Sequence, residues 1–367
     1  MSKILKPRLL PLGSRFSQGF IHYVFSEGVK QYWGSQHQAK IDQIFKSSNI
    51  RSGNFVFNPE GMNMSSFASL ASIDKSYKYA VETAVKTMKE VDTSGLNKVF
   101  ISSEIPSCPP LDNYLSHPNT TTLSGYGCYG SFKMIEEANA YLRLNPTHSV
   151  GLFSVEIPSR IWHTQFPLEL RQLIEIYSNC KGDEYYKLDI MRAIINNIVA
   201  ASLFRDNATF TVMLGPLHRS YYSQSGWTIH DNITEKIPQT ENLLGTNLSK
   251  CGSHIFTNPL ITSYIPSRAK ELIKTITYRN SRHYSEINNF LVHPGSFKLL
   301  RSIQKKFKRE LNLTSSYRSL EENGSCLSSS LFDVIHRDFD NVKDFQDGII
   351  YGMGPGLIHG CHYVIRR

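Results

Sequence analysis

A cysteine flanked by glycines precedes a predicted helix and has the setting of a nucleophile. The segment reads Gly125-Tyr126-Gly127-Cys128-Tyr129-Gly130, and residues 132–143 follow it with apolar side chains at helical spacing. Unpaired backbone N–H groups and the positive end of the helix dipole favour a thiolate, which is the reactive form of cysteine. Glycines leave the sulfur open to a substrate. The segment fits a catalytic cysteine and a structural cysteine in a glycine-rich turn equally well.

Two more polar residues stand at the ends of predicted elements. His293 follows a strand at 289–292, and Asn323 is placed at the start of a helix that runs to about residue 338. Histidine is the side chain that exchanges a proton with a thiol at neutral pH, and an asparagine amide can donate to a developing oxyanion. A turn histidine and a helix N-cap explain them as well. The order Cys, His, Asn also occurs in papain-like proteases, but their Cys–Trp signature is absent from the sequence.

The elements that must position these residues alternate between helix and strand. Strands are expected at 98–103, 150–155, 208–214, 289–292 and around 352–357, and helices at 73–91, 132–143, 188–204, 267–279 and 297–309. This alternation predicts an α/β fold with helices covering sheets. We divide the chain into a half that carries the cysteine, 1–215, and a half that carries the histidine and asparagine, 216–367. Residues 216–265 are rich in Ser, Thr, Asn and Gly and are interpreted as an insertion that opens the second half.

Composition narrows the class of protein. Forty per cent hydrophobic and 19% charged residues are typical of a globular chain, and no apolar run is long enough to span a bilayer. A secretory signal is not visible, so we expect a cytoplasmic protein. Six cysteines without a C-x-x-C pair argue against a zinc site and a disulfide scaffold. The net charge of +9 suits a phosphate-rich partner, but the basic cluster at 298–309 lies on a helix with a buried stripe and is interpreted as a solvated face, not a nucleic-acid footprint.

Five short segments of the chain occur in one known family in the same order and spacing. They are Gly127-Cys128-Tyr129-Gly130, residues 202–208, Val292-His293-Pro294-Gly295, Glu322-Asn323-Gly324-Ser325, and Gly352-Met353-Gly354-Pro355-Gly356-Leu357. They resemble motifs of the type III polyketide synthases, the chalcone and stilbene synthase family of the thiolase superfamily. The resemblance implies a five-layer αβαβα thiolase-like fold built from two similar halves, and a homodimer.

The resemblance also implies a reaction. Cys128 would take the acyl group of an acyl-CoA starter, and His293 and Asn323 would hold the thioester oxygen of malonyl-CoA during decarboxylation. The resulting carbanion would attack the acyl-cysteine in a Claisen condensation that makes a polyketide. The reaction needs no metal and no permanently bound cofactor, since CoA thioesters are its substrates.

Further residues are assigned by the same resemblance. Lys46 and Gly295 are expected to meet CoA. The substrate pocket is expected to include Ser103, Cys108, Phe204, Ile229 and Ser325, with Phe204 as a gate and Ile229 in place of a second gating phenylalanine.

Two other functions stay open. The first is a related enzyme of the ketoacyl synthase III type that performs one extension or a single acyl transfer, with an acyl-carrier protein as a possible donor. The second is a non-catalytic relative that binds acyl-CoA. The starter, the number of extensions and the mode of cyclisation depend on the shape of the cavity.

Overall fold

The computed structural model describes residues 6–14, 38–51, 70–105, 111–114, 117–158, 173–180, 184–249, 252–258, 260–307, 311–339 and 346–367. The elements of the first half are β1 (Arg8–Ser14), α2 (Gln38–Ser48), α3 (Leu70–Lys89), β2 (Lys98–Ser102), β3 (Thr120–Leu123), α4 (Gly130–Leu144), β4 (Ser149–Glu156), α6 (Glu184–Leu203) and β5 (Asn207–Leu214). Those of the second half are β6 (Trp227–Lys236), β7 (Leu244–Ser249), β8 (Gly252–Thr257), α7 (Ile261–Arg279), β9 (Asn289–Val292), α8 (Phe297–Phe307), α9 (Thr314–Asn323), α10 (Ser329–Phe339), β10 (Asp347–Met353) and β11 (Ile358–Arg366).

The strand order of the main sheet has an internal symmetry. The order is β3-β2-β4-β5-β1-β6-β11-β10-β9, and the two halves meet where β1 lies beside β6. On the far side of β1 lies β5, the last strand of the first half, and on the far side of β6 lies β11, the last strand of the second half; both pairs are antiparallel. Earlier strands of each half follow further out. The strand pairs β4–β2 and β10–β9 are both parallel. The two halves therefore repeat one topology.

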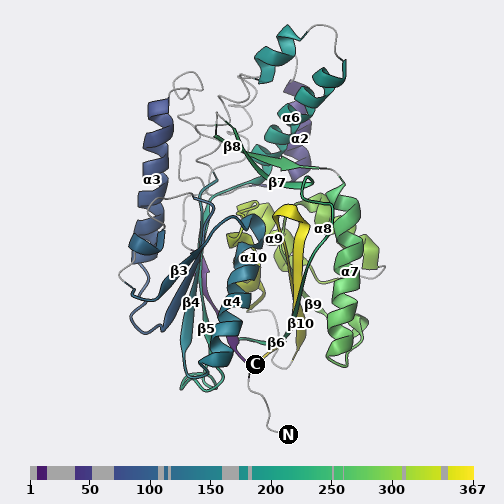
Figure 1. The fold of residues 1–367 in the computed structure, drawn as a ribbon. Helices are drawn as coiled ribbons and strands as arrows, with labels where there is room; N and C mark the ends of the chain where they lie inside the picture. Colours follow the sequence, from purple (N-terminus) through teal and green to yellow (C-terminus); the bar gives the residue numbers. More distant parts are fainter. Residues whose placement is uncertain are drawn as a thin grey trace.

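The helices and strands form five layers. Helices α4 and α10 lie in the centre, where they pack against each other and against strands of both halves of the sheet. Helix α3 covers the outer face of the first half, and α7 and α8 cover that of the second half, as Figure 1 shows. Each layer is joined to the next by an apolar cluster, and strands such as β4 and β10, which are covered on both faces, are buried along nearly their whole length. The predicted α/β architecture of αβαβα layers is confirmed.

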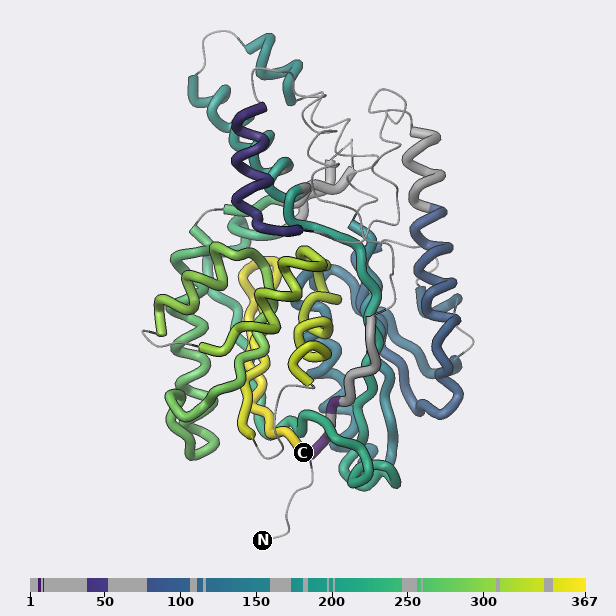
Figure 2. Tube along the Cα trace, turned by 180° about the vertical axis from the view of Figure 1, so that it is seen from behind, coloured from purple at the N-terminus to yellow at the C-terminus, as the bar shows by residue number. Residues whose placement is uncertain are grey.

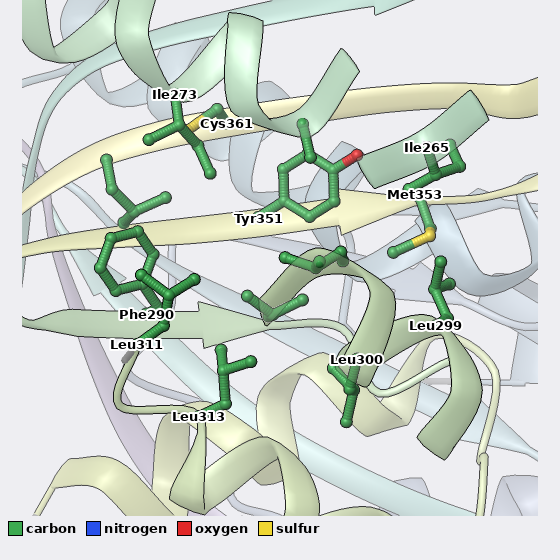
Figure 3. Packing of buried hydrophobic residues seen from close by; sticks show 14 of the residues in the cluster. Ile265, Ile273, Phe290, Leu299, Leu300, Leu311, Leu313, Tyr351, Met353 and Cys361 are labelled. Carbon is green, nitrogen blue, oxygen red and sulfur yellow. The ribbon is translucent and has the colours of Figure 1, made fainter. Parts of the chain in front are cut away.

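The apolar cluster of the second half extends along β9 and β10 to the end of the sheet at which His293 follows β9. Phe290, Leu311 and Ile273 lie at one end of the cluster in Figure 3, and Met353 and Leu299 lie at the other. At the end of the molecule beyond Met353, α2 and α6 stand side by side, and the β7–β8 hairpin packs against α6 (Figures 1 and 2).

Two expectations from the sequence are wrong. Residues 227–236, placed within an insertion at 216–265, form β6, which pairs with β1 and β11 at the centre of the sheet. Asn323, placed at the start of a helix, is the last residue of α9, and the next helix, α10, begins at Ser329. In the part of the chain that the structure describes, no helix is long and apolar enough to cross a membrane.

Candidate active site

A cavity of about 380 Å³ lies at the carboxyl ends of parallel strands from both halves. Cys128 comes from the first half, between β3 and α4, and His293 comes from the second half, directly after β9. Gly295, Phe204 and Ser325 also line the cavity. Ligands of α/β sheets bind at this edge because the loops that follow parallel strands converge there.

Cys128 is held in a short 3-10 turn, Gly127–Tyr129, that leads directly into α4. Gly127 adopts φ +49, and a Cβ at this position would lie 2.9 Å from the ring of Pro355. Only glycine allows the turn to approach the Pro355 loop of the other half so closely. Cys128 itself is half-buried with a free thiol.

The electrostatic setting of Cys128 is the reverse of the one expected from its place at a helix start. Burial, and after it the carboxyl groups of Glu156 and Glu104, raise the pKa of the Cys128 thiol to about 12. The helix start alone favours the thiolate, but desolvation and negative charge oppose it more strongly. The resting cysteine is therefore a neutral thiol that needs a base.

The two glutamates form a buried pair beneath the cysteine turn. The Gly127 N–H donates to Glu104 Oε1 at 2.6 Å, and the Glu104 N–H donates to Glu156 Oε2 at 3.0 Å. The Ser328 hydroxyl donates to Glu156 Oε1. Burial, and after it the charge of Glu104, hold the pKa of Glu156 well above its usual value. Burial also raises the pKa of Glu104, but hydrogen bonds from the backbone N–H groups of residues 125–127 lower it and offset part of this rise. Glu104 is thus the better site for the negative charge of the pair.

His293 has the properties of a neutral base. Its side chain is fully buried, and burial lowers the pKa of the imidazole to about 4. The backbone is fixed by a hydrogen bond from the His293 N–H to the Tyr351 carbonyl on β10, at 2.9 Å. Neither ring nitrogen has a hydrogen-bond partner among the residues that the structure describes. Both nitrogens are therefore available to a proton or a ligand in the cavity.

The segment around Asn323 differs from the expectation. The Asn323 amide donates from Nδ2 to Asp333 Oδ2 at 3.0 Å, and Asn323 is not among the described residues that line the cavity. Ser325, two residues later, is buried and lines the cavity beside Phe204, with which it forms an isolated parallel bridge.

The three remaining predicted pocket residues, Ile229, Ser103 and Cys108, are not found in the described lining of the cavity. Ile229 lies in the fully packed central cluster on β6, outside the described lining of the cavity, whereas Leu244 and Thr257 of the β7–β8 hairpin line it. Ser103 is buried at the end of β2, where its hydroxyl donates to the Val155 carbonyl at 2.7 Å, outside the described lining. Cys108 lies outside the described residues.

The mouth of the cavity carries positive charge. Lys46 is exposed in the last turn of α2, between Ile44 and Ser47, which both line the cavity. Lys298, at the start of α8, is exposed, in line with the solvated face expected from the sequence, and it also lines the cavity.

Glu104 and Glu156 are the functional candidates that sequence reasoning missed. Both follow or end buried strands, β2 and β4, which run parallel and side by side. Carboxylates at the ends of two adjacent parallel strands meet at one edge of the sheet, and this signal was present in the sequence.

Comparison with known proteins gives the class of the fold. No protein-family model matches the chain. The phloroglucinol synthase of Pseudomonas fluorescens is 23% identical over 328 residues, which cover 86% of this chain and 81% of that protein. The C-terminal type III polyketide synthase domain of Steely1 from Dictyostelium superposes with a TM-score of 0.76 at 14% identity, over 98% of this chain and 99% of that one. CsyB complexed with CoA-SH superposes with a TM-score of 0.76 at 17% identity, over 98% and 100%. The resemblance to type III polyketide synthases is confirmed, and the chain has their thiolase-like fold.

Proposed function

We propose that this protein is a CoA-dependent acyltransferase of the type III polyketide synthase kind, which condenses an acyl-CoA starter with malonyl-CoA. The observation that carries the proposal is that one cavity joins a thiol, Cys128, from the first half to a neutral imidazole, His293, from the second. The likeness in fold and sequence to polyketide synthases supports it.

Loading of the starter begins with the neutral thiol. His293 accepts the proton of Cys128, and the sulfur attacks the thioester carbonyl of the starter. The new C–S bond to Cys128 forms as the bond to CoA breaks, and the imidazolium returns its proton to the leaving CoA thiolate. Burial lowers the pKa of His293 and raises that of Cys128, so proton transfer between them is uphill in the resting site and proceeds together with attack of the sulfur on the thioester; the imidazolium then gives its proton readily to the leaving thiolate.

Extension consumes malonyl-CoA. The bond to the carboxylate breaks, CO₂ leaves, and the electron pair delocalises onto the thioester oxygen as an enolate, to which the neutral imidazole of His293 donates its N–H. The enolate carbon then attacks the acyl carbonyl on Cys128, the C–S bond breaks, and the released thiolate takes a proton from water. A β-ketoacyl-CoA results, and its return to Cys128 lengthens the chain.

The wall of the cavity favours an aliphatic starter. Ile44, Ile195, Val199, Leu203 and Leu244 contribute alkyl side chains from α2, α6 and β7. Such a wall gains more from burying a flexible alkyl chain than from a flat polar ring. A preference for a coumaroyl starter over a medium-chain acyl-CoA would contradict this part of the proposal.

The phosphates of CoA are assigned to the positive mouth. Lys46 and Lys298 supply charge there, and Gly295 supplies a turn in which the backbone can approach a ligand, with its N–H donating to the His293 carbonyl at 3.0 Å. We further propose that two copies form a homodimer, as the resemblance implies, and that an acyl-carrier protein is an alternative donor.

The first experiment is incubation with malonyl-CoA and a panel of acyl-CoA starters, followed by mass spectrometry of the protein and the products. We expect an acyl group on the Cys128 peptide, its loss in Cys128→Ala, and its retention in Cys180→Ala, which removes another partly exposed free thiol. Products heavier by successive ketide units are expected. Acylation that survives in Cys128→Ala would refute the assignment, and acylation without extension would favour a single acyl transfer.

A further inference from the structure

Helix α8 carries a basic face that starts at the mouth of the cavity. The buried side chains of the helix are apolar, and each of its exposed residues is a cation: Lys298, Arg301, Lys305 and Lys306. The first three are spaced i, i+3 and i+7, so they follow one side of the helix. Lys298 lines the cavity, and the other three lie outside its described lining. The basic face of α8 therefore extends from the mouth over the outer surface of the second half, beside α7 (Figure 1).

The charge of this face is not balanced within the part of the chain that the structure describes. Arg268 on the neighbouring α7 pairs with Glu271 at 3.0 Å, but none of the four cations of α8 has a carboxylate partner there, and α8 itself contains no acidic residue. Lys298 stands in the first turn of α8, where the helix dipole disfavours a cation. Arg301 and Lys305 repel each other at i, i+4 spacing. The arrangement lowers the stability of the helix, and a partner with negative charge would relieve the repulsion.

The basic face is longer than the phosphates of CoA require. Those phosphates are assigned to Lys46 and Lys298 at the mouth, whereas Arg301 and Lys305 continue the face to roughly 10 Å from Lys298 along the helix axis. An acyl-carrier protein holds its acyl group on the same pantetheine arm as CoA, but the arm is attached to a folded protein. The cavity can receive either arm, so the difference between the two donors lies outside the mouth. Acidic side chains along a helix of the carrier would meet the basic face there.

We propose that the basic face of α8 is the docking surface for an acidic acyl-carrier protein, which delivers the starter to Cys128 on its phosphopantetheine arm. This inference rests on the proposed function and deepens it, because it gives the alternative donor a binding site. In the loading step the Cys128 sulfur attacks the thioester of the arm, the new C–S bond forms, and the C–S bond to the arm breaks. His293 passes the proton of the Cys128 thiol to the leaving thiolate. The carrier dissociates with a free thiol on its arm, and extension uses malonyl-CoA as before.

Charges at the rim of an interface act mainly on the rate of encounter. Arg301 and Lys305 touch neither the cavity nor the reacting atoms, so their effect is expected on loading from a carrier and not on loading from CoA. The effect should be strongest at low salt, because exposed charges are screened as the ionic strength rises.

The test compares two donors of one acyl group. Octanoyl-CoA and an isolated acidic acyl-carrier protein that bears an octanoyl group on its arm are each supplied at limiting concentration, and the initial rate of acylation of Cys128 is followed by intact-protein mass spectrometry. In the double variant Arg301→Glu/Lys305→Glu we expect loading from the carrier to fall roughly 10- to 100-fold at low salt, with a smaller loss at high salt. Loading from octanoyl-CoA should stay within a few-fold of the parent protein, which also shows that the variant is folded.

A matched control changes the net charge equally on another surface. Lys86 and Lys89 are exposed on α3, which covers the first half, and the double variant Lys86→Glu/Lys89→Glu should load from both donors like the parent protein. A loss of carrier loading in this control equal to that in the α8 variant would assign the effect to net charge and overturn the docking site.

The other outcomes separate this inference from the proposed function. If the parent protein loads from octanoyl-CoA but not from the carrier, or if the α8 variant loads from the carrier at the parent rate, the docking site is overturned and the proposed function stands. Equal losses with both donors would show that the face only steers anions to the cavity, and would overturn it as well. If binding to anionic phospholipid vesicles is lost in the α8 variant while carrier loading is kept, the face belongs to a membrane contact and the inference falls. If the parent protein loads from neither donor, the proposed function falls and the docking site with it.

Discussion

Replacing Gly324 by alanine tests whether the turn that presents Ser325 depends on glycine. An alanine there must adopt φ 69 with ψ −168, which costs on the order of 2–3 kcal/mol of backbone strain. Its Cβ would also lie 2.5 Å from Arg205 Cγ and 2.9 Å from the Leu203 carbonyl oxygen. That carbonyl is fixed by its hydrogen bond from the Ser325 N–H, so the clash adds about 1–2 kcal/mol.

The expected result is a loss of about 3–5 kcal/mol in the free energy of unfolding, the sum of these two costs. At roughly 1.3 °C per kcal/mol for a chain of this size, the midpoint of thermal unfolding, followed by circular dichroism, should shift down by about 4–7 °C. Activity should also fall under conditions in which the variant is still folded, because displacement of residue 324 moves Ser325 out of the cavity.

Two matched glycines separate strain from clash. Gly95→Ala has open space around its Cβ and no left-handed backbone, so it is expected to be neutral or slightly stabilising. Gly125→Ala has open space but φ +81, so it isolates strain and should cost about 1 kcal/mol. If the midpoint of Gly324→Ala lies within about 1–2 °C of that of Gly95→Ala, the difference corresponds to only about 1 kcal/mol. The turn then does not require glycine, and the reasoning is refuted.

Three other predictions concern charge. Glu104→Gln keeps the hydrogen-bond acceptor and removes a carboxylate that raises the pKa of the Cys128 thiol, so alkylation of Cys128 by iodoacetamide at pH 8 should become faster; an unchanged rate would contradict the electrostatic argument. His362 is fully buried and burial lowers its pKa to about 3, so the unfolded chain takes up a proton near pH 6.5 that the folded chain does not, and its contribution to stability falls as the pH drops from 6.5 towards 3. The unfolding free energy, measured in urea, should fall between pH 7 and pH 4.5 by about 2–3 kcal/mol less in His362→Phe than in the parent protein. An equal fall in both proteins would disprove that folded His362 stays neutral. Lys298→Ala should raise the KM for acyl-CoA several-fold and weaken its salt dependence, whereas Lys305→Ala, on the same helix but outside the described lining of the cavity, should not; equal effects would remove Lys298 from the CoA site.

The sequence predicted those parts of the fold that depend on local patterns. The helix now seen as α3 and the strands β4 and β5 have apolar periodicities that fix their type. Cys128 and His293 were placed together because each follows a strand or opens a helix in a recognisable motif, and the structure brings both to one cavity.

The parts that the sequence did not predict depend on long-range neighbours. Strand β6 has polar residues that are half-exposed, such as Asn232, or exposed, such as Thr234, so its composition resembles a loop until its pairing with β11 is known. Ser325 lines the cavity beside Phe204, with which it forms a bridge, and Phe204 lies more than a hundred positions earlier in the chain. The pKa of Cys128 depends on Glu104 and Glu156; the sequence places each at the end of a strand, but only the long-range pairing of β2 with β4 brings them together beside the cysteine.

The position of β1 has a consequence for synthesis of the chain on the ribosome. This strand precedes both of its partner strands, which pair with it through residues 209–214 and 227–228. Until those residues emerge from the ribosome, β1 has no strand beside it, so both of its edges are open. Closure of the sheet is therefore a late event with a large loop-closure cost, and it makes the nascent protein vulnerable to pairing with other chains at these edges.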